Sequence, residues 1–341
     1  MKLSAIVKTG IAGVLALVAG VVFSAAEAAN INVTRCVGSL NKTLSGQTVT
    51  FWGFGTGGMM MMWCTGALPG AAIEVGVYPA GSGMSDTLNL TLNIGMMTPQ
   101  EAAPYRGHTI HMHGADVPTS EDGVPETYND TNGDTYTWTP TTEMAGSYLY
   151  HCHVHTVKHL EMGMYGALIA RPRNTSETWL NQLTHNTATA YNYVQNYVFG
   201  TVDPAYHTAT GDSTVFADYN PVYFMISGNQ GLTTSAPAIT LAAARNRKVA
   251  LRLLGLHSAN STFAVKDGSG NAKSFTVYTQ DGRELSTPQT VTSLDVTPGQ
   301  RFDIIFTTPS TAGTWYPQVT YKNLRNGTAY TNGTVYGRVT F

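Results

Sequence analysis

The 341-residue sequence predicts an all-β protein with two tandem β-sandwich domains that follow a signal peptide. Three observations support this fold class. Only 12% of the residues are charged, while Gly, Thr, Val and Tyr are abundant, a composition typical of compact strand-rich proteins. Short alternating or β-branched runs recur along the chain, separated by glycine, proline and Asn/Asp turns. The length suffices for two domains, each with its own core.

The first 28 residues have the composition of a secretory signal peptide. Lys2 and Lys8 precede an apolar run over residues 11–23, and the small-residue segment 26–28 follows it. A retained membrane anchor is the alternative, although the run is shorter than the ~20 apolar residues that a bilayer span needs. No later segment is long and apolar enough to span a membrane. We therefore expect a periplasmic or secreted protein with no membrane span in its mature chain.

Strand-like runs fill the first half of the mature chain. The six runs are residues 47–54, 71–78, 86–94, 135–140, 146–154 and 164–172. The composition changes in residues 170–191, which places a domain boundary near residue 173. The expected domains are residues 29–172 and 173–341.

The second half has the same rhythm after one helix signal. Residues 174–183, "NTSETWLNQL", could form a short helix capped by Thr175 or Ser176. Five strand-like runs follow, at residues 248–256, 273–280, 301–308, 313–321 and 334–341. The second domain is therefore predicted to be a sandwich like the first.

The charge balance excludes one class of partner. The formal net charge is −2, and it becomes −3 without Lys2, Lys8 and Glu27, which leaves 17 basic against 20 acidic residues. Such a chain has no basic patch for nucleic acid, so we expect no nucleic-acid partner.

Histidines gather in two short segments. Seven of the ten lie in "HTIHMHG" (His108, His111 and His113) and "HCHVHTVKH" (His151, His153, His155 and His159). Successive side chains of a strand point to opposite faces, so His151 and His153 share one face, about 6.6 Å apart, and Cys152 points to the other. One strand can therefore serve two metal sites on opposite faces.

Cys152 predicts a blue, or type 1, copper centre. Such a centre combines a thiolate, two imidazoles and a weak axial thioether. His159 is expected on the loop that follows Cys152, and Met164 is the expected axial ligand, with Met162 as an alternative. His108 is the best candidate for the second imidazole. Zinc remains chemically possible, but it tends to avoid thioethers, so the set favours copper.

The segments "HTIHMHG", "EDGVPET" and "GSYLYHCHVHTVKHLEMGMYGALIARP" resemble the copper-binding cupredoxin domain of multicopper oxidases, especially the two-domain bacterial type, and of the related copper nitrite reductases. "KVALRLLGLHSAN" and "VTPGQRFDIIF" resemble the family more loosely. The resemblance implies copper as cofactor and two tandem cupredoxin-like Greek-key β-sandwiches, the second without copper ligands. It implies a type 1 set of His108, Cys152, His159 and Met164, and a type 2/3 half-cluster of His111, His113, His151 and His153.

The second domain departs from the family pattern. A trinuclear cluster takes eight histidines, and two-domain oxidases obtain four of them from a second domain, commonly across a subunit interface. After residue 173 this chain has only His185, His207 and His257, isolated from one another. Nitrite reductases have an aspartate where this chain has His111, and a second-domain histidine near the position of Tyr321. Both differences disfavour nitrite reduction.

Three functions fit these motifs. The first is an oxidoreductase in which a symmetric homodimer brings two half-clusters face to face. The second is a non-enzymatic blue-copper electron carrier or copper-binding protein, and the third is a degenerate family member that handles copper. We expect an exported copper-dependent oxidoreductase that accepts and passes on single electrons, forms a homo-oligomer, and uses domain two to cover domain one and to mediate assembly. The sequence does not identify its substrate or its electron donor or acceptor.

Three further features of the sequence suggest structural or metal-binding roles. Export favours a disulfide between Cys36 and Cys64, the cysteines outside the histidine segment. The run Met59–Met62 could present soft ligands to Cu(I), although flexible core filling is the preferred interpretation. His155 continues the spacing of His151 and His153, either as an extra ligand or, preferably, as a solvent-exposed loop residue.

Overall fold

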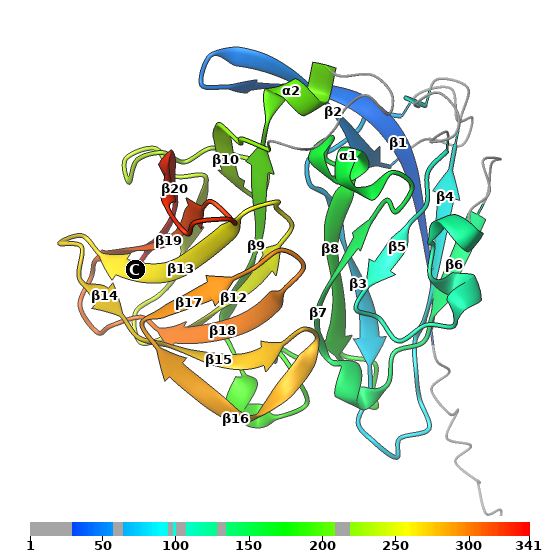
Figure 1. The fold of residues 1–341 in the computed structure, drawn as a ribbon. Coiled ribbons are helices and arrows are strands. Elements are labelled where there is room, and N and C mark those ends of the chain that lie inside the picture. Colours follow the sequence, from blue (N-terminus) through cyan, green and yellow to red (C-terminus); the bar gives the residue numbers. More distant parts are fainter. Residues whose placement is uncertain (1–28, 57–63, 95–97, 100–106, 128–133, 209–218) are drawn as a thin grey trace, which may run out of the picture.

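The structure, a computed structural model, describes residues 29–56, 64–94, 98–99, 107–127, 134–208 and 219–341. These residues form two β-sandwiches side by side (Figure 1). The prediction of an all-β protein is confirmed. The predicted signal peptide and the Met59–Met62 run lie outside the described residues.

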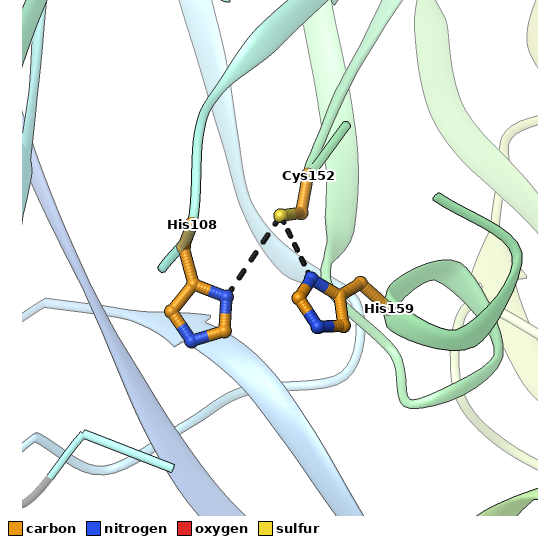
Figure 2. A group of neighbouring side chains, drawn as sticks. All are labelled: His108, Cys152 and His159. Atoms are coloured by element: carbon orange, nitrogen blue, oxygen red, sulfur yellow. Dashed lines mark hydrogen bonds between the residues drawn. The ribbon is translucent and has the colours of Figure 1, made fainter. Parts of the chain in front are cut away.

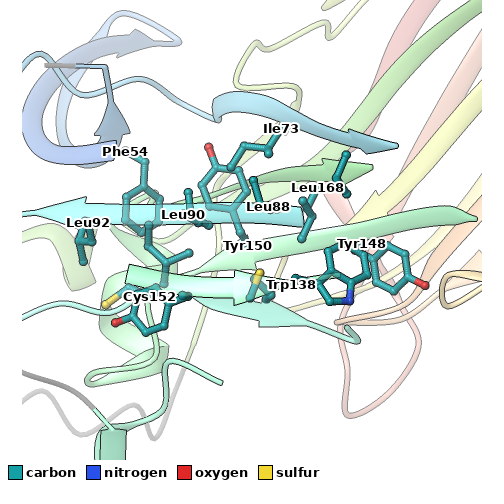
Figure 3. Packing of buried hydrophobic residues seen from close by; sticks show 14 of the residues in the cluster. Phe54, Ile73, Leu88, Leu90, Leu92, Trp138, Tyr148, Tyr150, Cys152 and Leu168 are labelled. Atoms are coloured by element: carbon teal, nitrogen blue, oxygen red, sulfur yellow. The ribbon is translucent and has the colours of Figure 1, made fainter. Parts of the chain in front are cut away.

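Two four-stranded sheets form the first sandwich. One has the order β2 (Gln47–Gly55), β1 (Asn30–Leu44), β4 (Thr87–Asn93) and β6 (Asp134–Trp138). The other has the order β3 (Gly70–Val77), β8 (Tyr165–Pro172), β7 (Gly146–His151) and β5 (His111–His113). Between them lies a core of large side chains that includes Phe54, Trp138, Tyr148 and Tyr150 (Figure 3).

The second sandwich is larger. Its first sheet has the order β10 (Tyr223–Ile226), β9 (Tyr193–Val202), β12 (Lys248–Gly255), β18 (Arg301–Thr307), β15 (Phe275–Gln280) and β16 (Arg283–Val291). The second has the order β11 (Ile239–Ala242), β20 (Ala329–Thr340), β19 (Thr314–Lys322), β13 (Asn260–Asp267) and β14 (Ala272–Lys273), and β17 (Ser293–Val296) pairs with β13. Phe263, Phe275 and Tyr321 are buried between these sheets.

Helices are short among the described residues. The α-helices are α1 (Thr156–Glu161) and α2 (Pro204–Thr208), and the single 3-10 turns are Thr119–Glu121, Pro125–Thr127, Thr142–Met144 and Thr187–Thr189. Within the described part of the chain, no helix is long and apolar enough to cross a membrane.

The helix predicted over residues 174–183 is wrong. The side-chain oxygen of Asn174 accepts hydrogen bonds from the backbone N–H groups of Ser176 (3.0 Å) and Thr178 (2.9 Å), which fixes a turn. Asn side chains compete with helices in this way because they offer the backbone a local alternative partner. Arg173 then pairs with Trp179 in an isolated β-bridge.

The Cys36–Cys64 disulfide is present, as predicted. It ties β1 to the segment that leads into β3. Close packing accompanies it, because a Cβ on Gly38 would lie only 2.0 Å from the Cys64 carbonyl oxygen. Glycine is therefore required where this segment crosses β1.

The two sandwiches share a buried apolar interface. Leu149 and Ile169, on the outward face of β7 and β8, belong to one cluster with Val198, Met225 and Leu254 of the second sandwich. The face of β7 that points away from the first core is therefore covered by the second domain. This contact places the histidine end of β7 against domain two.

A buried polar network crosses the same interface. The Ser147 hydroxyl donates to Asp303 Oδ1 (2.5 Å), and Thr279 Oγ1 donates to Asp303 Oδ2 (2.7 Å). Arg252 lies 3.4 Å from Asp303 and donates to Ser147 Oγ (3.1 Å). Asp303 is fully buried, so this carboxylate is compensated inside the protein and not by water.

Candidate metal centre

Strand β7 separates two groups of side chains by its alternation. Tyr148, Tyr150 and Cys152 belong to the core of the first sandwich. Leu149 belongs to the interdomain cluster, and His151 lines a cavity between the domains. The expectation that Cys152 and His151 face opposite sides agrees with this arrangement.

His108, Cys152 and His159 converge on the core side (Figure 2). Cys152 Sγ lies 3.1 Å from His159 Nδ1 and 3.8 Å from His108 Nδ1. All three residues are buried. His108 Nε2 lies 2.7 Å from the Pro99 carbonyl oxygen, and this contact orients the ring so that Nδ1 faces the sulfur. The group thus offers one sulfur and two imidazole nitrogens within ligand distance of a common point.

Met164 is brought to this group by two backbone hydrogen bonds. Cys152 N–H donates to the Met164 carbonyl oxygen (3.1 Å), and Met164 N–H donates to the His159 carbonyl oxygen (3.0 Å). Its side chain is fully buried in the same core cluster as Cys152. Met162, the alternative, is buried outside that cluster, and its carbonyl oxygen accepts from Trp52 N–H (2.7 Å).

A short helix, and not the expected loop, carries His159. Residue His155 adopts a left-handed conformation (φ 43°) immediately before α1, and His159 N–H donates to the His155 carbonyl oxygen (3.1 Å). One helical turn therefore folds the chain back toward Cys152. The His155 ring is partly buried, with its centroid 6.1 Å from that of His159.

The thiol of Cys152 is poised to ionise. Burial alone would raise its pKa, but the charge of His159 and hydrogen bonds with His108 and His159 outweigh burial. The pKa of Cys152 therefore lies well below its ordinary value. A thiolate is the form in which cysteine binds metals.

The other four histidines face the cavity between the domains. His111, His113 and His151 offer ligand atoms that all lie within 4.8 Å of one another. His113 Nδ1 and His151 Nε2 lie 3.2 Å apart. His153 lines the same cavity outside this group, with its ring stacked on His151 at 5.7 Å.

Hydrogen bonds orient two of these rings. His111 Nδ1–H donates to the Asp122 carbonyl oxygen (2.7 Å) and lies 3.1 Å from Asp122 Oδ1. His151 Nδ1–H donates to the Cys152 carbonyl oxygen (2.9 Å). Each bond leaves the Nε2 lone pair directed away from its partner, which is how second partners fix the tautomer of metal-binding histidines.

The imidazoles of this group are neutral at ordinary pH. Burial lowers the pKa of His111 and of His151, and burial with the charge of Arg301 lowers the pKa of His113 to about 4. Neutral imidazole is the form that binds a metal.

Domain two supplies the opposite wall of the cavity. The space, of about 360 Å³, is bounded there by residues such as Leu256, Ser258 and Gly299. His257, which was predicted to be isolated, also lines it. Its Nδ1 accepts from Ala259 N–H (3.3 Å), and its Nε2 lies 3.3 Å from Ser261 Oγ. Only the packing of the two domains reveals its position, so no sequence signal pointed to it.

The other second-domain residues that were compared with family ligands lie away from this cavity. His185 donates to the Val77 carbonyl oxygen (3.0 Å) and His207 Nδ1 to that of Thr50 (2.7 Å). Tyr321 is buried in the second core, where its hydroxyl donates to the Met225 carbonyl oxygen (2.6 Å). None of the three lines the histidine cavity.

Comparison with known proteins identifies the family. Two family models, both described as multicopper oxidase, match residues 102–175 and 185–337, and together they span more than half of the chain. The chain belongs to the multicopper oxidase family. Copper is the cofactor of this family, and the sulfur and imidazole donors described above fit it.

Solved structures of multicopper oxidases share the fold. The blue copper oxidase of Nitrosomonas europaea is 18% identical, with 91% of this chain and 85% of that chain covered and a TM-score of 0.66. The multicopper oxidase mgLAC is 17% identical, with coverage of 92% and 86% and a TM-score of 0.64. A metallo-oxidase of Campylobacter jejuni is 16% identical, with coverage of 92% and 60% and a TM-score of 0.63. No curated protein sequence matches this multicopper oxidase chain.

The comparisons also confirm the predicted architecture. Two tandem cupredoxin-like sandwiches, predicted from the strand rhythm and from the resemblance of the copper motifs, match the fold of these multicopper oxidases.

Proposed function

We propose that this multicopper oxidase family member is an exported, copper-dependent oxidoreductase that accepts and passes on single electrons. His108, Cys152 and His159 hold a type 1 copper, with Met164 as axial ligand. The half-cluster of His111, His113, His151 and His153 holds further copper. The observation that carries the proposal is the convergence of Cys152 Sγ, His159 Nδ1 and His108 Nδ1 in a buried site.

The surroundings of Cys152 suit electron transfer. When bound, copper supplies a one-electron redox couple. Thr109 N–H points at Cys152 Sγ (3.5 Å), and hydrogen bonds to such a sulfur tune the potential of a blue centre. Burial of the three donors excludes water, so little solvent has to reorganise when charge changes.

A short covalent path joins the two groups of ligands. His151 and Cys152 are neighbours in the chain, and His151 Nδ1–H donates to the Cys152 carbonyl oxygen (2.9 Å). An electron at the sulfur therefore has a route of few bonds to the half-cluster. This adjacency favours an oxidoreductase over a simple carrier, which would need only the blue centre.

Export and assembly are part of the same proposal. The signal-like residues 1–28 and the Cys36–Cys64 disulfide support a periplasmic or secreted location, because disulfides persist in oxidising compartments. Domain two covers domain one through the apolar cluster that contains Leu149 and Val198. We propose that the protein forms a homo-oligomer.

The test is spectroscopic. The full chain is produced with its leader, and the mature copper-loaded protein is examined by visible absorption, electron paramagnetic resonance and oxygen uptake with a one-electron donor. We expect an intense blue band that bleaches on reduction, a donor-dependent oxygen uptake, and loss of the band in Cys152→Ser. A colourless copper-loaded protein would overturn the type 1 site. A blue band that is reduced and reoxidised without catalytic turnover of the donor would overturn the proposal of an enzyme and would support the electron carrier.

A further inference from the structure

The histidine cavity has ligands on one side only. The family resemblance implies eight imidazoles for a trinuclear cluster, and the first domain supplies four. Among the described residues of domain two, His257 is the one imidazole on the opposite wall. Both of its nitrogens lie within hydrogen-bond distance of its own domain, at Ala259 N and Ser261 Oγ.

Domain two also blocks the face that a second half-cluster would need. A Cβ placed on Gly299 would lie 3.3 Å from His113 Nε2, so the backbone of this turn packs directly against the imidazole. Pro298 and Leu256 continue the same wall. The half-cluster of a symmetry-related chain could reach His113 only if this turn moved away.

The three converging histidines fit a single ion. Imidazole nitrogens bind such ions at about 2.0–2.1 Å, so two of them on one tetrahedral ion lie about 3.3 Å apart. His113 Nδ1 and His151 Nε2 are 3.2 Å apart. His111 completes the group within 4.8 Å, and its orientation is fixed by Asp122.

We propose that His111, His113 and His151 bind one copper ion in place of the trinuclear cluster. This inference rests on the proposed function for the identity of the metal. Three protein ligands leave a coordination position free, as in catalytic metal sites, and that position faces the cavity of about 360 Å³ between the domains. The site therefore takes a small exogenous ligand, of the size of azide or dioxygen, and it is complete within one chain.

Copper counting tests the proposal. The mature protein is loaded with copper, dialysed, and analysed for copper per chain and by electron paramagnetic resonance, with and without azide. We expect two coppers per chain, one blue and one with an ordinary non-blue signal that azide perturbs. About 2.5 coppers per chain, the count for two blue ions and one trinuclear cluster shared by two chains, would overturn it. Four coppers per chain, or a spin-coupled pair without a resonance signal, would also overturn it.

Variants assign each ion to its residues. His113→Ala should lose one copper and the azide-sensitive signal while the blue band stays, and His111→Ala provides the same test if His113→Ala does not fold. His257→Gln is the matched control and should keep two coppers. A copper lost in His257→Gln, or an unchanged count in both His113→Ala and His111→Ala, would contradict the three-histidine site.

Failure of the proposed function gives a different result. Cys152→Ser should lose only the blue ion and keep the azide-sensitive one. If the unaltered protein has no blue band but still holds one azide-sensitive copper that His113→Ala removes, the type 1 assignment fails and the three-histidine site stands. If the blue band is present and azide changes no copper signal, the three-histidine site fails alone.

Discussion

Trp52 packs edge-on against His159, with the two ring centroids 5.6 Å apart. It also contacts His108, at 6.2 Å, and it is only partly buried, whereas both histidines are fully buried. Trp52 therefore lies between the proposed type 1 ligands and solvent. The backbone N–H of Trp52 donates to the Met162 carbonyl oxygen (2.7 Å) and so holds β2 against the chain that follows α1.

Replacement of this indole should lower the reduction potential of the blue centre. In Trp52→Ala water reaches the imidazole edges and stabilises the more highly charged oxidised state. We expect a decrease of up to about 60 mV, which is a tenfold change in a one-electron equilibrium. Redox titration of the blue band measures it. Trp52→Phe keeps an aromatic cover and should stay close to the unaltered protein, and an unchanged potential in Trp52→Ala would contradict this role.

The Cys36–Cys64 disulfide should contribute strongly to stability. It closes a loop with a sequence separation of 28. Loop-closure entropy predicts a loss of about 3–4 kcal/mol in the free energy of unfolding when it is removed. Urea unfolding of the double variant Cys36→Ser/Cys64→Ser measures the loss. Copper content should not change, because the proposed ligands are separate residues, and an unaltered unfolding midpoint would show that the link is not formed.

Asp303 should anchor the interface between the domains. In Asp303→Leu the buried Arg252 loses its carboxylate partner, and an unpaired buried charge costs about 3–5 kcal/mol. Thermal or urea unfolding measures this. The control is Glu74→Ala, which breaks the exposed pair with Arg171 (3.1 Å) and should cost no more than about 1 kcal/mol. Equal losses in the two variants would contradict the importance of burial.

His257 should make stability depend on pH. Burial lowers its pKa from 6.5 to about 4, so as the pH falls the unfolded chain takes up this proton before the folded chain does. The stabilisation is complete above pH 6.5 and is lost as the pH approaches 4. For this residue alone we expect a loss of about 2 kcal/mol between pH 7 and pH 5.

Copper-loaded protein is the right sample for that measurement, because bound metal keeps the proposed ligand histidines from taking up protons. His257→Gln should show a smaller decrease in the free energy of unfolding between the two pH values. The same decrease in both proteins would assign the pH dependence to other groups.

Residue spacing and strand alternation predicted the features of the site that depend on neighbouring residues in the chain. Cys152, His159 and Met164 lie within thirteen residues, and strand alternation placed Cys152 and His151 on opposite faces without any knowledge of the tertiary structure. Strand β1 (Asn30–Leu44) was not predicted, because its outer half has few apolar residues and its pairing with β4 is long-range. The position of His257 could not be predicted either, since it follows from how two separate sandwiches pack.

Two errors have a common physical origin. The stretch after residue 173 has helix-like composition, but the side chain of Asn174 binds the backbone and forms a turn. The stretch before His159 was expected to be a loop, but it forms α1. In both places a few hydrogen bonds decide between conformations of similar free energy, and composition does not resolve such small differences.

The alternation of β7 has an evolutionary consequence. One residue inserted between Gly146 and His151 would turn every later side chain to the other face, so that the sulfur would enter the interdomain cavity and an imidazole would enter the core. Both metal sites would be lost in a single event. An insertion between Cys152 and His159 only lengthens the turn or α1. Descendants of this gene should therefore vary in length after the cysteine and keep a constant length before it, a difference that a collection of related sequences would reveal.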